Sequence, residues 1–506
     1  MINKIADNKK IARNTILLYL RMFITMAVAL FTSRAILAAL GVEDFGIYNI
    51  VGGIVVIFSF ISSSLRNATG RYISYELGKK DNYDIKKVFN VCIQCHFIII
   101  LILLLVTETI GLWMLHNVVN IPEHRSDVVD IVYQFSILTF IINIATVPFQ
   151  STIISYERMS FYAYLSIIEV VLKLLIVYFL YISPIDRLIT YSILMSLVTF
   201  TLLSIYYYYC TQKLDLGHYK YTKDNALMKR ILVFSGMSMI NGGASVVSIQ
   251  GGNILMNMFY GVITNAAAGI ANQVSTHVYA FVSNFQSAFQ PQIIKLYACK
   301  DNYNLKKLIN RASLASFYLM LIISVPILYE TDYILSLWLV DVPDYSSVFC
   351  RLLIISSLID AIQAPLWMLI YGTGNIKKYT TWTSIITFLN IPIAYFLMEI
   401  GYPPYVCFLS RILTGILCSI YRVGHAKYLT DLDIKDYLKG VYIRPLIICV
   451  LIFLYCFLSY NINITSSIFN IFISFIICCI LIIIIGFDTS DRTIVYNLII
   501  NKLQKK

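Results

Sequence analysis

Apolar residues run along the chain in stretches of roughly 20 to 30, long enough for a helix to cross a bilayer core. Short polar segments separate these stretches. The pattern predicts an all-α, polytopic membrane protein of about fourteen transmembrane helices. The predicted spans are residues 14–40, 45–67, 88–115, 128–152, 160–182, 187–210, 229–258, 264–289, 310–330, 347–371, 379–399, 403–423, 441–460 and 464–487.

Lysine and arginine concentrate in every second loop. Examples are the pairs Lys9-Lys10, Lys86-Lys87, Lys306-Lys307 and Lys377-Lys378. The alternate loops hold Arg125 and Arg187 beside acids such as Asp44. Because short cytoplasmic loops collect Lys and Arg, this alternation predicts an even number of spans in the inner (plasma) membrane, with both termini cytoplasmic.

Composition supports a lipid environment and argues against several other classes. Hydrophobic residues make up 59% of the chain and charged residues 13%, against roughly half and a quarter in soluble proteins. The net charge of +12 is spread over the inside loops, so we expect no nucleic-acid partner. The eleven cysteines predict neither a disulfide framework nor a metal site. No nucleotide-binding or catalytic motif is found, so we expect no cofactor and no enzyme activity.

An internal repeat divides the predicted spans. Residues 80–90 (KDNYDIKKVFN) recur as residues 300–310 (KDNYNLKKLIN), a shift of about 220 positions. A second alignment pairs Pro148 with Pro365 and Tyr162 with Tyr379. The repeat predicts two parallel six-helix lobes, residues 1–212 and 213–425, followed by two additional helices and a cytoplasmic tail in residues 426–506. Two such lobes are typical of an alternating-access transporter.

Ionisable residues within predicted spans are costly in lipid and are therefore candidates for function. In the first lobe, Arg21, Arg34 and Arg66 are candidates for binding the phosphates of a substrate, because guanidinium matches phosphate geometry. Arg21 and Arg66 could instead extend to the membrane surface. Glu169 and Lys173 are four residues apart and share a helix face. They are either a structural ion pair or an ion-coupling site at Glu169 that releases Lys173 for substrate.

The second lobe has fewer charges and more amides. Asp360 is a candidate for ion coupling and Arg411 for substrate binding, although the two could form a salt bridge between helices. Asn241 and Gln286 belong to a stretch rich in Asn, Gln and Gly. Their amides could bind sugar hydroxyls, or could hold neighbouring helices together.

Several motifs resemble those of a known transporter family. They are Thr32-Ser-Arg-Ala35, the segment 40–53 (LGVEDFGIYNIVGG) and Gln290-Pro-Gln-Ile-Ile294. With the predicted spans, they resemble the polysaccharide-biosynthesis (Wzx-type) flippases of the MATE-like MOP superfamily. The resemblance implies a flippase that moves an undecaprenyl-pyrophosphate-linked oligosaccharide to the periplasmic leaflet for O-antigen, lipopolysaccharide, capsule or exopolysaccharide assembly. Membrane lipids and the polysaccharide polymerase machinery are the implied partners.

Two alternatives remain open. An ion-coupled multidrug exporter of the MATE type has the same implied fold, but a cationic cavity repels cationic drugs. A membrane enzyme that uses a polyprenyl substrate, such as a polymerase or glycosyltransferase, usually carries a large external loop. The longest outside loop expected here, near residues 331–346, is short.

Overall fold

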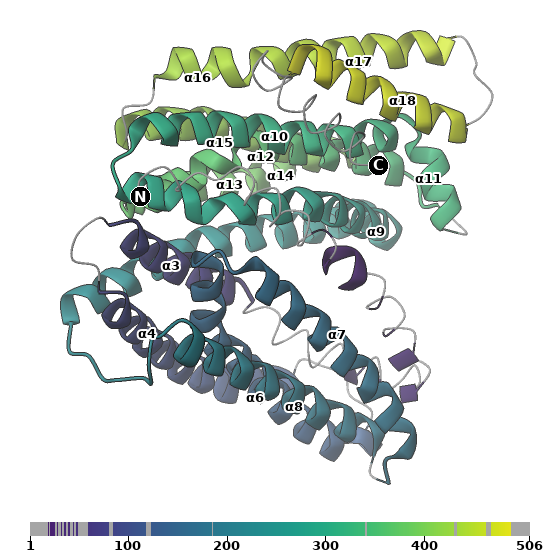
Figure 1. Ribbon diagram of the computed structural model, residues 1–506. Helices are drawn as coiled ribbons and strands as arrows, with labels where there is room; N and C mark the ends of the chain where they lie inside the picture. The colour runs from purple at the N-terminus through teal and green to yellow at the C-terminus, as the bar shows by residue number, and fades with distance from the viewer. Residues whose placement is uncertain are drawn as a thin grey trace, which may run out of the picture. The chain divides into compact units, whose positions relative to one another are not determined.

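The computed structural model describes residues 19, 21–25, 28, 32, 35–36, 39–40, 44, 47–48, 59–79, 84–117, 123–184, 186–339, 342–429, 433–461 and 467–486. Throughout these residues the only regular secondary structure is helical (Figure 1). The helices are α3 (Ser59–Gly78), α4 (Ile85–Val106), α5 (Leu112–Asn117), α6 (Ser126–Ser155), α7 (Met159–Ile182), α8 (Arg187–Tyr208), α9 (Asn225–Ala298), α10 (Asn302–Tyr329), α11 (Thr331–Trp338), α12 (Ser346–Thr373), α13 (Lys377–Phe388), α14 (Asn390–Glu399), α15 (Val406–Leu429), α16 (Ile434–Val441), α17 (Ile443–Asn461) and α18 (Ser467–Leu481).

Eleven helical segments among the described residues are long and apolar enough to cross a membrane. Each coincides with one of the predicted spans, within several residues at either end. The predicted span 264–289 is also helical and forms the second half of α9, after a break at Gly261 (φ +80°). The predicted spans 14–40 and 45–67 lie largely outside the described residues. The all-helical fold class is confirmed.

Aspartate begins five of these helices. Asp84, Asp186, Asp224, Asp301 and Asp433 precede α4, α8, α9, α10 and α16, and each side chain accepts a hydrogen bond from a backbone N–H of the first turn. The first N–H groups of a helix have no partner within it, and the helix dipole favours a negative charge there. These aspartates therefore fix where the helices start.

The chain forms two compact units. Unit 1 contains residues 1–243 and 294–300, and unit 2 contains residues 244–293 and 301–506. The last turn of α9 thus belongs to unit 1, where Lys295 Nζ lies 2.7 Å from Glu157 Oε1. Gly78 of α3 faces the same turn so closely that a Cβ would lie 2.7 Å from the Lys295 carbonyl oxygen. The lobe boundaries expected at residues 212 and 425 stay a prediction.

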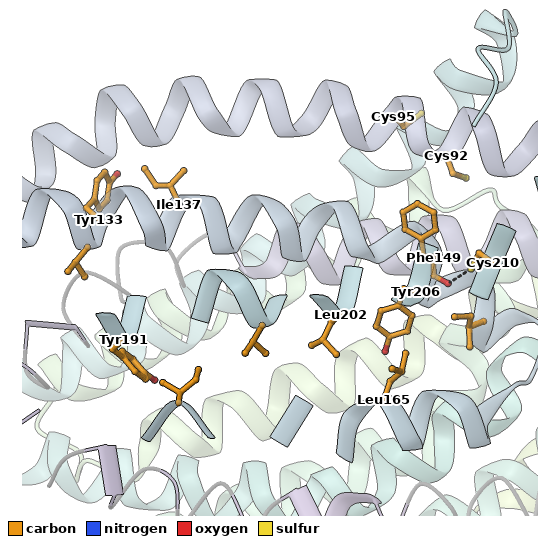
Figure 2. Packing of buried hydrophobic residues seen from close by; sticks show 14 of the residues in the cluster. Cys92, Cys95, Tyr133, Ile137, Phe149, Leu165, Tyr191, Leu202, Tyr206 and Cys210 are labelled. Atoms are coloured by element: carbon orange, nitrogen blue, oxygen red, sulfur yellow. Dashed lines mark hydrogen bonds between the residues drawn. The ribbon is translucent and has the colours of Figure 1, made fainter. Parts of the chain in front are cut away.

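The core of unit 1 lies where α6 packs against α3, α4 and α8. Figure 2 shows part of it, including Tyr133, Phe149, Tyr206 and Cys210. After α4 the helix widens for one turn at Thr107–Gly111, and the Tyr133 hydroxyl donates to the Thr107 carbonyl oxygen (2.7 Å). A side chain at Gly111 would overlap that hydroxyl, so this turn needs glycine. Pro148 lies inside α6 and Pro365 inside α12, and these two prolines are the pair that the repeat aligns.

Candidate functional site

A polar cluster joins the helices of unit 1. Arg66 of α3 donates from Nη1 to Oε1 of Gln150 on α6. The Tyr206 side chain of α8 is within hydrogen-bonding reach of Gln150, and Arg66 and Glu169 lie close enough to affect the Tyr206 hydroxyl by charge. Tyr206 is only 5% exposed. Side chains from four helices therefore meet around one buried hydroxyl.

Two further interactions extend this group, the unit 1 cluster. The Arg21 guanidinium carbon lies 4.7 Å from the centre of the Tyr162 ring on α7, within cation–π range. On the same helix, Lys173 Nζ lies 2.6 Å from Glu169 Oε1. Of the residues that the structure describes, the cluster contains three cations, Arg21, Arg66 and Lys173, against one anion, Glu169. Its charge excess is positive, so it can attract a negatively charged group.

Unit 2 holds a second polar cluster, centred on Arg422 of α15. Its Nη1 donates to Gln363 Oε1 on α12 (2.9 Å), and its Nε donates to the Tyr379 hydroxyl on α13 (2.8 Å). Gln363 and Tyr379 are 1% and 2% exposed. The other amide atom of Gln363, Nε2, is buried with no partner in the described part of the chain, so it remains a spare donor.

Asp360 belongs to this unit 2 cluster and lies about one helical turn before Gln363 on α12. Its side chain is exposed, and it interacts by charge with Arg422 and Arg411. Asp360 forms no ion pair with any described residue. The salt bridge between Asp360 and Arg411, one of the two interpretations of this pair, is not formed in the structure, and Asp360 interacts more strongly by charge with Arg422 than with Arg411.

Amides link the helices around this cluster. Gln286 of α9 is 3% exposed and donates from Nε2 to the Ala361 carbonyl oxygen (3.3 Å). Asn390 of α14 donates to Ser248 (3.0 Å) and accepts from Ser410 (2.6 Å). These contacts favour the helix-packing interpretation for Gln286. Asn241 is half-buried and lies in unit 1, so the two predicted amides are in different units.

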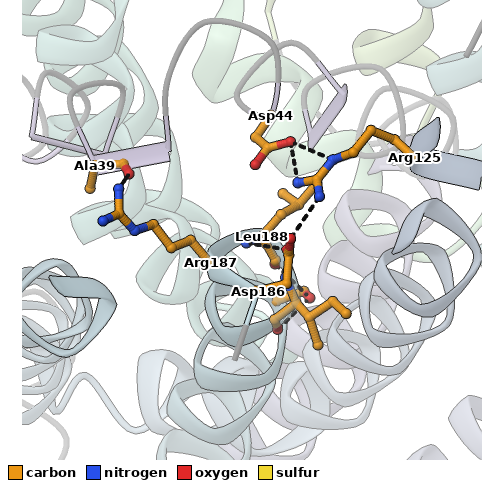
Figure 3. A network of polar contacts seen from close by, with 8 residues as sticks. Ala39, Asp44, Arg125, Asp186, Arg187 and Leu188 are labelled. Atoms are coloured by element: carbon orange, nitrogen blue, oxygen red, sulfur yellow. Dashed lines mark hydrogen bonds and ion pairs between the residues drawn. The ribbon is translucent and has the colours of Figure 1, made fainter. Parts of the chain in front are cut away.

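A third network joins loop ends of unit 1 (Figure 3). Arg125 donates from Nε to Asp44 (3.0 Å) and from Nη1 to Asp186 (2.6 Å), while Arg187 donates to the Ala39 carbonyl oxygen (3.0 Å). Burial alone would raise the pKa of Asp186, but the Arg125 hydrogen bond and two backbone N–H donors outweigh it and lower the pKa. The two basic residues that the charge pattern assigns to outside loops thus lie together.

Most of the predicted site residues lie in the two clusters. Arg21, Arg66, Glu169 and Lys173 meet in the unit 1 cluster, and Asp360 and Arg411 belong to the unit 2 cluster. Gln286 supports the second cluster, and Asn241 is separate from it. Arg34 lies outside the described residues. Their roles in binding or coupling stay predictions.

Several residues of both clusters were missed. Arg422 stands at the very end of the predicted span 403–423 and was not singled out, whereas α15 continues to Leu429 and holds it within the helix. Gln150, Tyr206 and Gln363 are uncharged and gave no signal as ionisable groups. Tyr162 and Tyr379 were noted only because the repeat pairs them, and that pairing could have indicated equivalent positions in the two clusters.

Cys92 and Cys95 are three positions apart, a spacing that metal-binding cysteine pairs also have, whereas we expect no metal site from the sequence. Both are fully buried on α4, and burial among apolar side chains keeps a thiol inert. In the described part of the chain, no three His, Cys, Asp or Glu side chains are grouped to hold a metal ion.

Comparison with known proteins gives a consistent result. The profile of the MatE family matches residues 18–179 and 244–396. No curated protein sequence matches the chain. A structure described as MATE in complex with MaD3S is similar, with a TM-score of 0.70, 13% identity, and coverage of 84% of this chain and 97% of that chain.

Two other structures are similar to the same extent. An outward-facing multidrug resistance MATE family transporter of the MOP superfamily has a TM-score of 0.71 and 11% identity, with 83% and 96% of the two chains covered. A MOP superfamily transporter from Pyrococcus furiosus, described as having a binding pocket of reverse polarity, has a TM-score of 0.69 and 12% identity, with the same coverage. At these identities the likeness shows the fold alone.

Proposed function

We propose a cargo for this chain from the premise that it belongs to the MatE family and is a membrane transporter. The cargo is a polyprenyl-pyrophosphate-linked oligosaccharide repeat unit. The protein moves it by alternating access from the cytoplasmic to the periplasmic leaflet, for assembly of O-antigen, capsule or exopolysaccharide. On this proposal the protein resides in the inner membrane with both termini cytoplasmic, and works beside the polysaccharide polymerase machinery.

The observation that carries the proposal is the charge of the unit 1 cluster. Among the described residues of this cluster, Arg21, Arg66 and Lys173 outnumber the acid Glu169. A pyrophosphate brings the opposite charge. It accepts many hydrogen bonds, and arginine can offer it paired N–H donors. Cationic drugs would be repelled from the same place.

A second candidate is an ion-coupled multidrug exporter, which the family membership supports equally. Asp360 favours it, because an exposed carboxylate in a membrane-spanning helix can attract a cation. One similar structure is described as a multidrug resistance transporter. The description of a reversed pocket polarity and a different function for the Pyrococcus furiosus protein links pocket charge to cargo within this superfamily.

The test is a flipping assay with the full-length protein in vesicles. The probe is a fluorescent polyprenyl-pyrophosphate-linked oligosaccharide, and the readout is the rate at which a membrane-impermeant reductant reaches it. Replacing Arg66→Gln removes a charged donor and should slow flipping by about tenfold to a hundredfold. Arg66→Lys keeps the charge and should retain part of the rate.

The matched control is Arg230→Gln, an exposed arginine of unit 1 outside the cluster, which should flip at the wild-type rate. Wild-type flipping by Arg66→Gln would remove the headgroup role. Export of a cationic dye by the wild-type vesicles, without flipping of the lipid probe, would establish the drug exporter instead.

A further inference from the structure

The amide side chains of α9 differ in burial within unit 2. Gln286 is buried and donates to the Ala361 carbonyl oxygen, so it holds helices together. Gln250, Asn253 and Asn257 are not buried. Asn253 donates from Nδ2 to Gln250 Oε1 (3.0 Å), and the Asn257 side chain has no hydrogen-bond partner in the described part of the chain. Most donors and acceptors of these three amides are therefore open to a ligand.

Helical geometry places the three amides on one side of α9. Successive residues of an α-helix are about 100° apart, so Gln250, Asn253 and Asn257 lie within an arc of about 60°. We call these three residues the amide stripe. On the opposite side, Ser248 accepts a hydrogen bond from α14, and Leu255 belongs to the hydrophobic core of unit 2. The amide stripe therefore points away from the core of its unit.

Exposed apolar side chains flank the amide stripe. Val247, Ile254 and Met258 lie about a quarter turn to one side, and Ile249 lies to the other. A helix that faces lipid is most apolar at the centre of its exposed side, but here that centre is polar. Amides without partners are unfavourable in hydrocarbon, and residues 225–261 form one of the segments able to cross a membrane. The amide stripe therefore faces water or a polar ligand rather than lipid.

The charge of α9 favours an uncharged ligand. Between Arg230 and Lys295 the sequence contains no lysine, arginine, aspartate or glutamate. A phosphate is bound best by cations, and a metal ion or a cationic drug by acids. An amide donates and accepts at once, as a sugar hydroxyl does, so neighbouring amides can exchange paired hydrogen bonds with neighbouring hydroxyls. The amide stripe thus has the chemistry of a sugar site.

We propose that the amide stripe binds the sugar of the transported lipid through its hydroxyl groups. This inference rests on the proposed function, because it assigns the uncharged part of that cargo to unit 2. The positive charge excess of the unit 1 cluster suits the pyrophosphate, and the uncharged stripe suits the sugar. The three amides then contribute to the choice among sugars.

The first test measures whether this side of α9 is in contact with water. Val246 lies in the middle of the arc of the amide stripe, and Val247, at the same depth, lies on its apolar flank. Each is replaced by cysteine in the full-length protein in lipid nanodiscs, where a charged thiol reagent reaches both faces. Because only the thiolate reacts and it forms in water, Val246→Cys should react about tenfold faster than Val247→Cys. Equal rates overturn the proposal.

Mass spectrometry reads this reaction without interference, because α9 contains no native cysteine. The second test adds either of two probes to Val246→Cys. One is the oligosaccharide released from the lipid of the flipping assay, and the other is inorganic pyrophosphate. The oligosaccharide should slow the thiol reaction by about tenfold at saturation, whereas pyrophosphate should leave it unchanged. No protection by the oligosaccharide, or equal protection by both probes, overturns the proposal.

Variants then assign the protection to the amides. Gln250→Leu with Asn253→Leu keeps the approximate size of both side chains but removes their hydrogen bonds, so protection of Val246→Cys should be lost. Gln250→Asn with Asn253→Gln restores two amides and should recover part of it. The control is Gln212→Leu, the same change at an exposed amide outside α9, which should keep full protection. Protection that survives the double leucine variant overturns the proposal.

These measurements need no transport, so they fail separately from the flipping assay. If the lipid probe is flipped but the oligosaccharide gives no protection, the sugar site is wrong and the proposed cargo stands. If the oligosaccharide protects but the lipid probe is not flipped, the proposed function is wrong and the sugar site stands.

Discussion

The Arg21 guanidinium lies 4.7 Å from the centre of the Tyr162 ring, and the sequence repeat pairs Tyr162 with Tyr379. In unit 2, the Arg422 guanidinium lies 6.0 Å from the centre of the Tyr379 ring and also donates to its hydroxyl. Both tyrosines stand in the first turn of their helix. Each unit thus sets an arginine against the paired tyrosine, although the arginines come from helices that the repeat does not pair.

The first prediction concerns the ring of Tyr162. Tyr162→Phe keeps the aromatic face beneath Arg21, so flipping of the fluorescent lipid in vesicles should stay close to wild type. Tyr162→Leu removes the face and about 0.5–2 kcal/mol of cation–π attraction, so the rate should fall by about twofold to thirtyfold. If Tyr162→Phe is as slow as Tyr162→Leu, the hydroxyl and not the ring positions Arg21.

The second prediction separates the two interpretations of Glu169 and Lys173. Exchanging the two residues, Glu169→Lys with Lys173→Glu, leaves an ion pair with the same spacing on α7. A purely structural pair predicts unchanged transport by the exchanged protein. A role in substrate binding predicts that transport is lost, because the cation moves by about one helical turn. Thermal unfolding of the purified protein checks that the exchange leaves the fold intact.

Some of these contacts could be predicted from the sequence and others could not. The pairing of Glu169 with Lys173 was predictable because both stand on one helix, whose geometry is known in advance. The Arg422 contacts were not, because Gln363 and Tyr379 are 59 and 43 residues away in the chain. Helical periodicity gives the face on which a side chain lies, but the partner depends on how several helices pack.

The third prediction is a coupling between Asp360 and Arg422. Arg422→Gln removes two hydrogen bonds from a charged donor and the positive charge that interacts most strongly with Asp360, so it should lower unfolding stability by about 2–3 kcal/mol. Adding Asp360→Asn removes the carboxylate that has lost its partner, and should recover about 0.5–3 kcal/mol. Denaturant titration of the two single variants and the double variant in detergent measures this coupling.

Arg411→Gln is the control for this pair, because Arg411 acts on Asp360 by charge more weakly than Arg422 does. It should destabilise the protein less than Arg422→Gln does. Strictly additive effects of Arg422→Gln and Asp360→Asn would show that the two groups do not act on each other.

The fourth prediction is a pH dependence at the Arg125 network. Because the pKa of Asp186 is lowered in the folded protein, its stabilising contribution is complete above the ordinary aspartate value of about 3.9 and is lost as the pH falls through the folded value. Arg125→Met should therefore lower the unfolding temperature at neutral pH. The difference from wild type should shrink once the pH falls below about 4.

Tryptophan fluorescence during heating in detergent, at several pH values, measures this difference. Asp44→Asn removes one of the two carboxylate partners of Arg125 and should produce a smaller loss at neutral pH. A difference between wild type and Arg125→Met that persists unchanged in acid would contradict the assignment to these carboxylates.

The fold class could be predicted from the sequence, because span length and loop charge are properties of single segments. A long apolar stretch has to be helical in lipid, whatever surrounds it. The division of α9 between the two units could not be predicted, because the predicted lobe boundary followed the sequence repeat. In the structure α9 begins in unit 1, continues in unit 2 after Gly243, and returns to unit 1 at Ile294.

This path of α9 has a consequence for the prediction that the chain arose by duplication of a six-helix unit. If the chain were cut within segment 214–224, the second fragment would still supply residues 225–243 and 294–300 of unit 1, including Lys295, the partner of Glu157. A gene encoding one half alone would therefore make a protein that lacks part of its own core. Exchange of segments with a second copy, as in a domain-swapped dimer, would supply the missing part. Fusion of two copies into one chain makes that exchange intramolecular and independent of protein concentration.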